Sequence, residues 1–478
     1  MTHESPAPSP VTASLLAAGL PADDSARWCA AEPLFAVAAD TTATTDALAR
    51  DRDVLSRYAA AGAELLGRLP AKPQRIPAEV AAADAIKEAL QAARIRFLRA
   101  YSGRVYAELT SDFREAVRVD ALVYRAGERF PGLTPTRDAV LAERQHPQRD
   151  KDGMEIDQGL FLSQMLALPR AGLHLCWSML RPHPDTQHHL AAFQRTGVLE
   201  LPGATVRRDG RAGYVEMHNP RYLNAEDDAT LDGLEIAIDL VSLDPAIDVG
   251  VLRGARVEHP RYRDQHVFSA GINLTHLYQG QIAYLFYITR DMGLVNKLYR
   301  GLSGPEFLPD EPEWTTEVPW IAAVEAFAIG GGCQLLLVMD HILAEAGAFF
   351  NLPARKEGII PGAANLRLPR FVGDRLARQG ILFERQFPAD SPEGRLLCDR
   401  VVAVGEMDAA IAKAVTTLTG SGVVSAASNR RALRVAQEPL DVFRSYMATY
   451  AREQAYCHFS PALIANLEAH WTARQRKP

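Results

Sequence analysis

Residues 319–344, PWIAAVEAFAIGGGCQLLLVMDHILA, decide the fold class of this chain. The apolar run at 319–327 predicts a buried strand, the glycines at 330–332 end it, and the apolar residues beyond them predict a helix and a further strand. Glycine after a strand lets the backbone approach a ligand closely, and the free N–H groups of a helix start stabilise negative charge. The stretch therefore predicts an α/β protein with an anion site at a helix start.

The same alternation continues on the N-terminal side of this stretch. Residues 198–220 predict a strand, a turn at 209–210 and a second strand. An amphipathic helix follows at 231–245, and then a short apolar strand at 248–254. A second helical stretch is expected at about 275–299. Strands that alternate with helices favour a parallel sheet with crossover connections.

The remaining segments predict helices and tails. Residues 1–34 are expected to be a flexible N-terminal tail and lead-in, because the first ten or so are rich in Pro and Ser. Residues 35–197 predict a helical domain, which has no converging polar motif and is assigned to packing or assembly. The catalytic domain is predicted at 198–465, C-terminal helices included, with a tail at 466–478.

Composition excludes several classes of function. The chain has 478 residues, a net charge of -6 and no Lys/Arg-rich run, which argues against nucleic-acid binding. Five cysteines, odd in number and without a CxxC, argue against a disulfide framework or a zinc site and fit a reducing cytoplasm. The first residues lack the features of a signal peptide, and no apolar run approaches a membrane span. We therefore expect a cytoplasmic protein.

Four segments together resemble the crotonase (enoyl-CoA hydratase) family over about residues 198–465: HNPRYLNA (218–225), FSAGINL (268–274), the opening stretch, and FFNLPARKEGIIPGAANLRLPRFVG (349–373). The resemblance implies a spiral ββα core, a CoA-thioester substrate and a homotrimer, often doubled to a hexamer. It also implies that the backbone N–H groups of Ile272 and Gly331 form an oxyanion hole, which stabilises an enolate or a tetrahedral intermediate.

The chain departs from the hydratases of this family at the positions that carry protons. Hydratases have glutamates where this chain has Gln334 and Ala354, and neither side chain can transfer a proton. Water addition to a double bond needs general acid–base groups near the reacting carbons. Glu357 follows closely, but the register set by Gly358 puts it outside the position of the family's glutamate. The pattern therefore keeps enolate stabilisation and lacks the hydratase machinery.

Within the family, the GGGCQ motif, the ARKEGIIPGAANLRL segment and the long N-terminal helical region resemble a cofactor-independent dioxygenase branch. The resemblance implies oxidation of 3,5-dihydroxyphenylacetyl-CoA by O₂ at the α-carbon, which yields 3,5-dihydroxyphenylglyoxylate and free CoA for antibiotic precursor supply. The enolate itself would reduce O₂, so no metal or organic cofactor is expected. Gln334 would hydrogen-bond the ring hydroxyls, since a carboxylate there could protonate the carbanion.

Two further residues are candidates for substrate binding. Glu226 follows the first of the four segments, where the family lines its acyl pocket; the alternative is a carboxylate at a helix N-terminus, beside Asp227 and Asp228. Arg290 lies on a largely apolar stretch and would contact a phenol; the alternative is an ion pair with Asp291 or with a partner subunit.

Other functions stay open. An acyl-CoA hydrolase or isomerase would use the same oxyanion hole but needs a general base, and a non-catalytic CoA-binding subunit would need none. His183 and Asp185, with His188 and His189 close behind, have the spacing of a non-haem iron site. They lie in a Pro-containing loop outside the crotonase-like part, which favours a solvated loop over a metal site.

Overall fold

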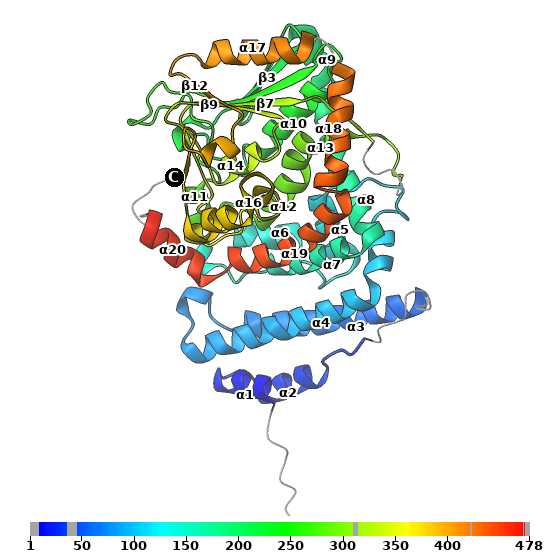
Figure 1. Ribbon diagram of the computed structural model, residues 1–478. Helices are drawn as coiled ribbons and strands as arrows, with labels where there is room; N and C mark the ends of the chain where they lie inside the picture. Colours follow the sequence, from blue (N-terminus) through cyan, green and yellow to red (C-terminus); the bar gives the residue numbers. More distant parts are fainter. Residues whose placement is uncertain (1–8, 36–44, 309–313, 421–422, 472, 474–478) are drawn as a thin grey trace, which may run out of the picture.

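The computed structural model describes residues 9–35, 45–308, 314–420, 423–471 and 473 (Figure 1). In this part of the chain, the largest sheet has seven strands in the order β1-β2-β3-β4-β7-β9-β12. The first three pair antiparallel, and the pairs from β3 to β12 are parallel. Their bounds are β1 Val198–Leu201, β2 Ala204–Asp209, β3 Ala212–Met217, β4 Val249–Gly254, β7 Trp320–Val324, β9 His341–Glu345 and β12 Arg400–Val402. The predicted parallel sheet is confirmed.

Two of the expected strands are each split in two. The apolar run at 319–327 bends after β7, and its end, β8 (Phe327–Ile329), joins a second sheet. Likewise the chain leaves β9 and forms β10 (Phe349–Asn351), which pairs parallel with β8 and antiparallel with β11 (Phe387–Pro388). A two-stranded sheet of β5 (Leu302–Ser303) and β6 (Thr315–Thr316) lies apart. The bends carry the glycines after β8 away from the large sheet.

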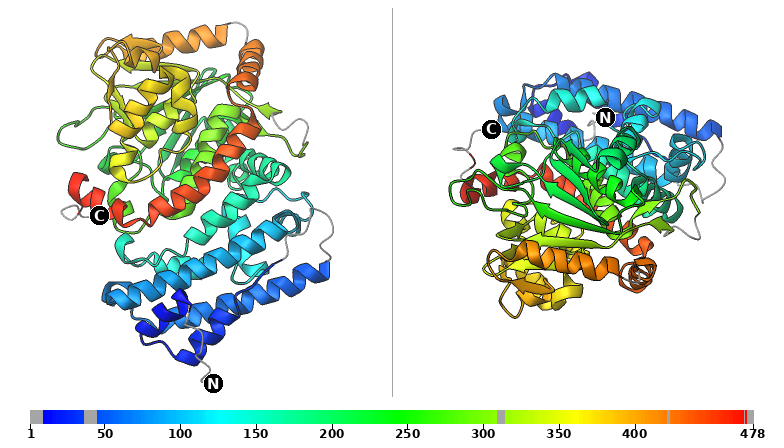
Figure 2. Two further views of the ribbon diagram at one scale, coloured as in Figure 1. Left: turned by 60° about the horizontal axis from the view of Figure 1, so that its bottom comes forward. Right: turned by 90° about the horizontal axis from the view of Figure 1, so that it is seen from above.

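Helices cover both faces of the large sheet, which lies between them in the two views of Figure 2. Along β4, Val251 packs in a cluster with Met407 and Ile411 of α17, whereas Leu252 belongs to the main core on the other face, with α10. The helices of this part are α10 Leu231–Leu243, α11 Leu274–Tyr278, α12 Tyr284–Arg290, the π-helical turn η4 Asp291–Val295, α13 Asn296–Arg300, α14 Gly331–Leu336, α15 Ala354–Glu357, α16 Ala364–Phe383, α17 Met407–Gly420, α18 Val423–Gln437, α19 Leu440–His458 and α20 Pro461–Trp471.

The N-terminal region is helical, as predicted, but its start differs from the prediction. Residues 10–30, expected within a flexible lead-in, form two helices that bury Leu15 and Trp28; residues 1–8 lie outside the described part. At the other end, α20 continues past residue 465 and buries Leu467. The N-terminal helices are α1 Pro10–Ala17, α2 Ala22–Ala30, α3 Thr45–Gly67, α4 Pro77–Leu109, α5 Val119–Arg129, α6 Arg137–Glu143, α7 Ile156–Ala167, α8 Pro169–Leu180 and α9 Thr186–Thr196.

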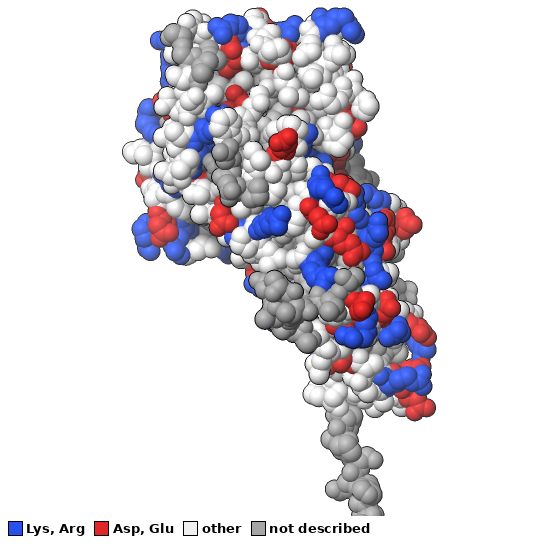
Figure 3. All heavy atoms as spheres, turned by 90° about the vertical axis from the view of Figure 1, so that its right-hand side faces the viewer, with Lys and Arg blue, Asp and Glu red and all other residues white. Residues whose placement is uncertain are grey.

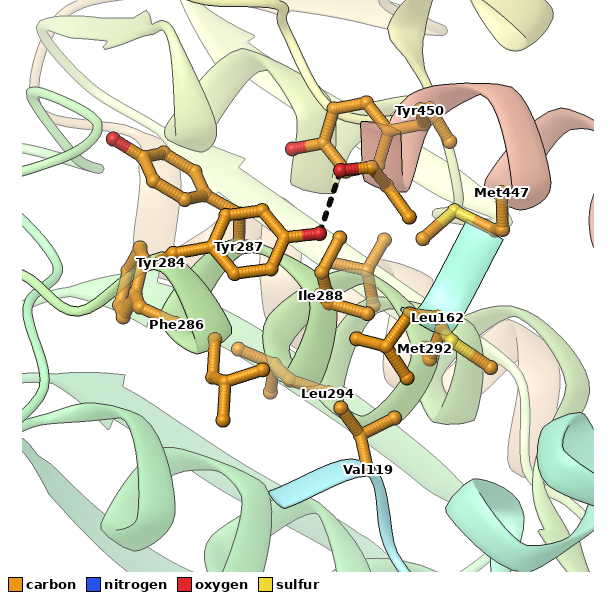
Figure 4. Packing of buried hydrophobic residues seen from close by; sticks show 14 of the residues in the cluster. Val119, Leu162, Tyr284, Phe286, Tyr287, Ile288, Met292, Leu294, Met447 and Tyr450 are labelled. Atoms are coloured by element: carbon orange, nitrogen blue, oxygen red, sulfur yellow. Dashed lines mark hydrogen bonds between the residues drawn. The ribbon is translucent and has the colours of Figure 1, made fainter. Parts of the chain in front are cut away.

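The N-terminal helices share one hydrophobic core with the rest of the chain, from Leu15 to Ala473. Figure 4 shows Val119 of α5 and Leu162 of α7 beside Ile288 and Met292, which flank Arg290 and Asp291 in the chain. Close packing of this kind holds a segment in one position, because a shift would open voids. The helical region therefore supports the segment that carries Arg290.

The surface gives two further observations. On the face shown in Figure 3, acidic and basic side chains are interspersed, and neither sign dominates. Among the described helices, none combines the length and the apolar character that crossing a membrane requires.

Candidate active site

The two glycine segments predicted to form one site are in direct contact. An isolated bridge pairs Ser269 with Ala328, and the Ile329 amide donates to the Ser269 carbonyl at 3.0 Å. Gly271 has a φ of +85°, and a Cβ there would lie 2.9 Å from the Gly331 nitrogen and 2.8 Å from the Ile329 oxygen. Only glycine fits at this position, since a side chain would displace the start of α14.

Within the described chain, the backbone N–H groups of Ile272 and Gly331 are not used in hydrogen bonds of the secondary structure. The backbone amide of Glu226 donates to the Gly271 carbonyl at 2.7 Å, and the backbone carbonyl of Glu226 accepts from the Asn273 amide at 2.8 Å. The N–H of Ile272, between Gly271 and Asn273, therefore points away from Glu226. Gly331 is the first residue of α14, where an N–H has no acceptor within the helix. Across the described residues, no backbone carbonyl accepts from either amide, and both residues line the same hollow.

That hollow, the inner pocket, encloses about 430 Å³ including its mouth. It is lined by Glu226 and Ile272, by α12 and Asp291, by the start of α14, by the 354–362 segment and by Tyr450 of α19. Tyr287 of α12 and Tyr450 of α19 both line it.

Arg290 organises the polar end of the inner pocket. Its Nε and Nη2 donate to the two oxygens of Glu226 at 2.6 and 2.9 Å, a bidentate pair between buried side chains. Nη2 also donates to the Gly331 carbonyl at 2.8 Å, and Nη1 donates to Oε1 of Gln334 at 2.9 Å. The contact with Asp291 is longer, 3.4 Å.

These contacts argue against the structural alternatives named for Glu226 and Arg290. Glu226 does not serve as a helix N-terminal carboxylate, because Arg290 binds both of its oxygens. The main ion pair of Arg290 is with Glu226 rather than Asp291. Since the Gln334 oxygen accepts from Arg290, its NH₂ group faces elsewhere, and no described group accepts from it. The structure thus brings the predicted residues Glu226, Arg290 and Gln334 together beside Gly331.

Two more carboxylates line the inner pocket, and sequence reasoning missed both. Burial raises the pKa of Asp291 to about 6, although Arg290 lowers it; the side chain is hydrogen-bonded by Tyr450. Burial, with the charge of Glu384, raises the pKa of Glu357 to about 7. Perturbed carboxyls in a pocket are candidates for chemistry.

Glu357 lines the inner pocket although it lies outside the position of the family's glutamate, which Ala354 occupies. It ends the single turn of α15, which begins at Ala354, and residues three apart lie on the same face of a helix. Both residues line the inner pocket. That spacing was the signal in the sequence.

A second hollow, the outer channel, opens next to the inner pocket and encloses about 1370 Å³ including its mouth. Its lining includes the cationic or titratable side chains Arg221, His259, Lys356 and His470. Ile272 and Glu357 are the residues that line both hollows. They therefore mark the junction through which a ligand would pass.

The loop with His183 and Asp185 does not line the inner pocket. His183 is 3.9 Å from Asp185 and 3.8 Å from Asp232, and its backbone amide donates to Asp239. Within the described residues, no three His, Cys, Asp or Glu side chains are grouped to hold a metal ion.

Replacing Gly271 by alanine is expected to displace the Gly331 amide and to lower turnover by about 100-fold or more, the loss typical of one missing oxyanion donor. The matched control is Gly347→Ala, which has a φ of +91° and nothing within 4 Å of the added Cβ. Both variants carry backbone strain, but only Gly271→Ala should lose activity in a CoA-release assay. Equal activities of the two variants would contradict the role of this close contact.

Comparison with known proteins gives a consistent family. Residues 208–446 match the enoyl-CoA hydratase/isomerase family. The chain is 44% identical to (3,5-dihydroxyphenyl)acetyl-CoA 1,2-dioxygenase of Amycolatopsis orientalis, over 85% of this chain and 92% of that protein. It is 31% identical to a probable enoyl-CoA hydratase of Rhizobium meliloti (strain 1021), over 41% of this chain and 68% of the relative.

A solved structure was also found. The crystal structure of an enoyl-CoA hydratase from Mycobacterium avium subsp. paratuberculosis K-10 aligns with 58% of this chain and 99% of its own, at 21% identity and a TM-score of 0.47.

Proposed function

The chain belongs to the enoyl-CoA hydratase/isomerase (crotonase) family, and we propose that it is a dioxygenase that oxidises 3,5-dihydroxyphenylacetyl-CoA with O₂ at the α-carbon. The proposal rests on its 44% identity to the Amycolatopsis enzyme over most of both chains. The observation that carries it is a pair of free amides beside Gln334 and Ala354, where hydration would need carboxylates.

The proposed reaction begins with the thioester oxygen between the amides of Ile272 and Gly331. Loss of an α-proton gives an enolate, whose negative charge these donors stabilise. The enolate reduces O₂, and a C–O bond forms at the α-carbon. The distal peroxide oxygen then attacks the thioester carbonyl, and CoA leaves as the thiolate. Cleavage of the O–O bond with loss of the second α-proton gives the aryl glyoxylate, which contains both atoms of O₂.

Recognition of the ring is assigned to the polar end of the inner pocket. The NH₂ group of Gln334 has no acceptor in the described part of the chain and would donate to a ring hydroxyl. Glu226 and Arg290 stand beside it as an acceptor and a donor already aligned by their mutual pair. A fixed polar group that matches a substrate hydroxyl discriminates strongly against analogues that lack it. We therefore expect the two meta hydroxyls to determine specificity.

The wider assignments follow from this proposal. The outer channel would hold the CoA moiety, with Arg221 and Lys356 near its phosphates. A homotrimer or hexamer, a cytoplasmic location and a role in glycopeptide antibiotic precursor supply complete the proposal; neither a nucleic acid nor a membrane is a proposed partner.

The alternative function, an acyl-CoA hydrolase or isomerase, needs a general base, and Glu357 is a candidate for it. The two functions differ in their need for O₂. Incubation with 3,5-dihydroxyphenylacetyl-CoA in air and under nitrogen separates them: a dioxygenase releases one CoA per O₂ consumed and stops without O₂, whereas a hydrolase releases CoA equally in both. Isotope from ¹⁸O₂ in both the ketone and the carboxylate of the product would identify the dioxygenase.

Oxygen uptake is expected to survive removal of metals. The substrate enolate is itself electron-rich, so it supplies the electrons that a metal or flavin gives in other oxygenases. Protein dialysed against a strong chelator, with its metal content measured, should retain its full rate. Iron or copper in stoichiometric amount, whose removal stops uptake and whose return restores it, would overturn this expectation.

A further inference from the structure

We propose that Glu357 is the base that removes the α-proton of the bound thioester. The proposal takes its substrate from the proposed function, but the proton transfer precedes and does not require the reaction with O₂. The residue would thus be a catalytic residue at a position other than the two glutamate positions that Gln334 and Ala354 occupy.

The position of Glu357 is the first support. With Ile272, it lines both the inner pocket and the outer channel. A thioester joins an acyl group to CoA, so a ligand that fills both hollows has its thioester at their junction. A Cβ built on Gly330 would lie 4.0 Å from Oε2 of Glu357, which places this carboxylate next to the residue that precedes the Gly331 donor. The α-carbon is one bond from the carbonyl carbon that the two amides would hold.

The freedom of the carboxylate is the second support. Three carboxylates line the inner pocket: Glu226, Asp291 and Glu357. Arg290 binds both oxygens of Glu226, and Asp291 is hydrogen-bonded by Tyr450 and lies beside Arg290. Among the described residues, none donates a hydrogen bond to the carboxylate of Glu357. A base must have a lone pair available for the substrate, and Glu357 meets this requirement.

The charges around Glu357 tune its basicity. Burial is the main effect that raises its pKa to about 7; Glu384 adds to it and Lys356 opposes it. Glu384 is in turn paired with Arg355 at 2.8 Å. Of the other elements that pack nearby, α12 contributes Tyr287, whose pKa Glu357 helps to raise, and α20 contributes His470 of the outer channel. A base with a pKa near the working pH is ionised often enough to act and strong enough to accept a proton.

In the proposed step, an oxygen of Glu357 forms a bond to the α-hydrogen and the C–H bond breaks. The electron pair moves into the enolate, whose charge rests on the oxygen at the Ile272 and Gly331 amides. Glu357 is then neutral, and its proton leaves with the CoA thiolate after oxygenation. In the absence of O₂ the proton returns to carbon, so the enzyme should exchange the α-hydrogens of its substrate with solvent.

The test is hydrogen exchange under nitrogen in D₂O with 3,5-dihydroxyphenylacetyl-CoA, followed by mass spectrometry. Wild-type protein is expected to exchange both α-hydrogens, and Glu357→Gln to slow exchange by about 100-fold or more, the usual range for a lost general base. Binding of 3,5-dihydroxybenzoyl-CoA, which has no α-hydrogen, should be nearly unchanged and shows that the variant is folded. Exchange by Glu357→Gln at the wild-type rate overturns the proposal.

The pH profile gives a second readout. A base acts when it is deprotonated, so the wild-type exchange rate should rise with pH through about 7, the pKa of Glu357. Glu384→Gln removes a neighbouring charge that raises this pKa, so its profile should shift to lower pH with the same plateau. A profile that does not shift counts against Glu357. If exchange depends on Glu357 but the protein consumes no O₂, the dioxygenase proposal is wrong and Glu357 is still the base. If Glu357→Gln exchanges α-hydrogens and consumes O₂ at the wild-type rates, Glu357 is not the base and the dioxygenase proposal stands.

Discussion

Arg290→Met should lose nearly all oxygen uptake and much of the stability of the fold. The change removes donors to Glu226, Gln334 and the Gly331 carbonyl. Breaking a buried ion pair by removing one partner costs about 3–5 kcal/mol, because the other charge stays buried and unpaired. Hydrogen bonds to a charged group are worth roughly 1.5–3 kcal/mol each, so turnover should fall by at least about 100-fold. Chemical denaturation and oxygen uptake measure the two effects.

Two further variants separate the contribution of the Arg290–Glu226 ion pair to stability from the contribution of Arg290 to turnover. Glu226→Gln in the Arg290→Met background neutralises the orphaned carboxylate, and we expect it to restore part of the stability but none of the activity. Arg430→Met is the matched control, since Arg430 is also buried and binds Glu317 and Asp340, away from the inner pocket. It should lose stability and keep the turnover of the folded protein. Full turnover by Arg290→Met would show that the guanidinium does not order the site.

The sequence predicted those features of the fold that depend on local patterns. Apolar runs and glycines located β4, β7 and α14, because strand and helix starts follow from neighbouring residues. The bend that sends 327–329 into a second sheet was missed, since a continuous apolar run gives no sign of a change of sheet. Residues 10–30 were misjudged because they were grouped with the Pro- and Ser-rich first ten residues, although they form two short helices that bury few side chains.

The site was predictable where the family pattern fixes a position, and not where burial creates the chemistry. Ile272, Gly331 and Gln334 were located from their segments, and the structure places all three at one pocket. The pairing of Arg290 with Glu226 joins positions 64 residues apart, which no local pattern reveals. The sequence placed Glu357 outside the position of the family's glutamate but could not show that its surroundings raise its pKa to about 7. Such a shift depends on which side chains cover the carboxyl in three dimensions.

Gln334→Glu is expected to fold and to lose at least about 100-fold of its oxygen uptake, on the scale of a general acid placed in a site. The Gln334 oxygen accepts from Arg290 at 2.9 Å, and Asp291 lies within 3.4 Å of the same guanidinium nitrogen. A third carboxyl around one guanidinium cannot readily ionise there, because Glu226 already occupies the other face of Arg290. The introduced carboxyl would therefore remain protonated and stand beside the enolate as an acid.

An acid at this position would return a proton to the carbanion before O₂ reacts with it. Gln334→Glu should thus still exchange α-hydrogens with D₂O under nitrogen, at a rate equal to or above that of the wild type, while oxygen uptake collapses. Gln334→Met is the matched control, because it also removes the amide but offers no proton; it should lose only about tenfold, the worth of one hydrogen bond to the ring. Equal losses of uptake in the two variants would mean that Gln334 serves only to bind the ring. A divergence between exchange and uptake in Gln334→Glu alone would show that an amide stands here because oxygenation does not tolerate a second proton donor besides Glu357.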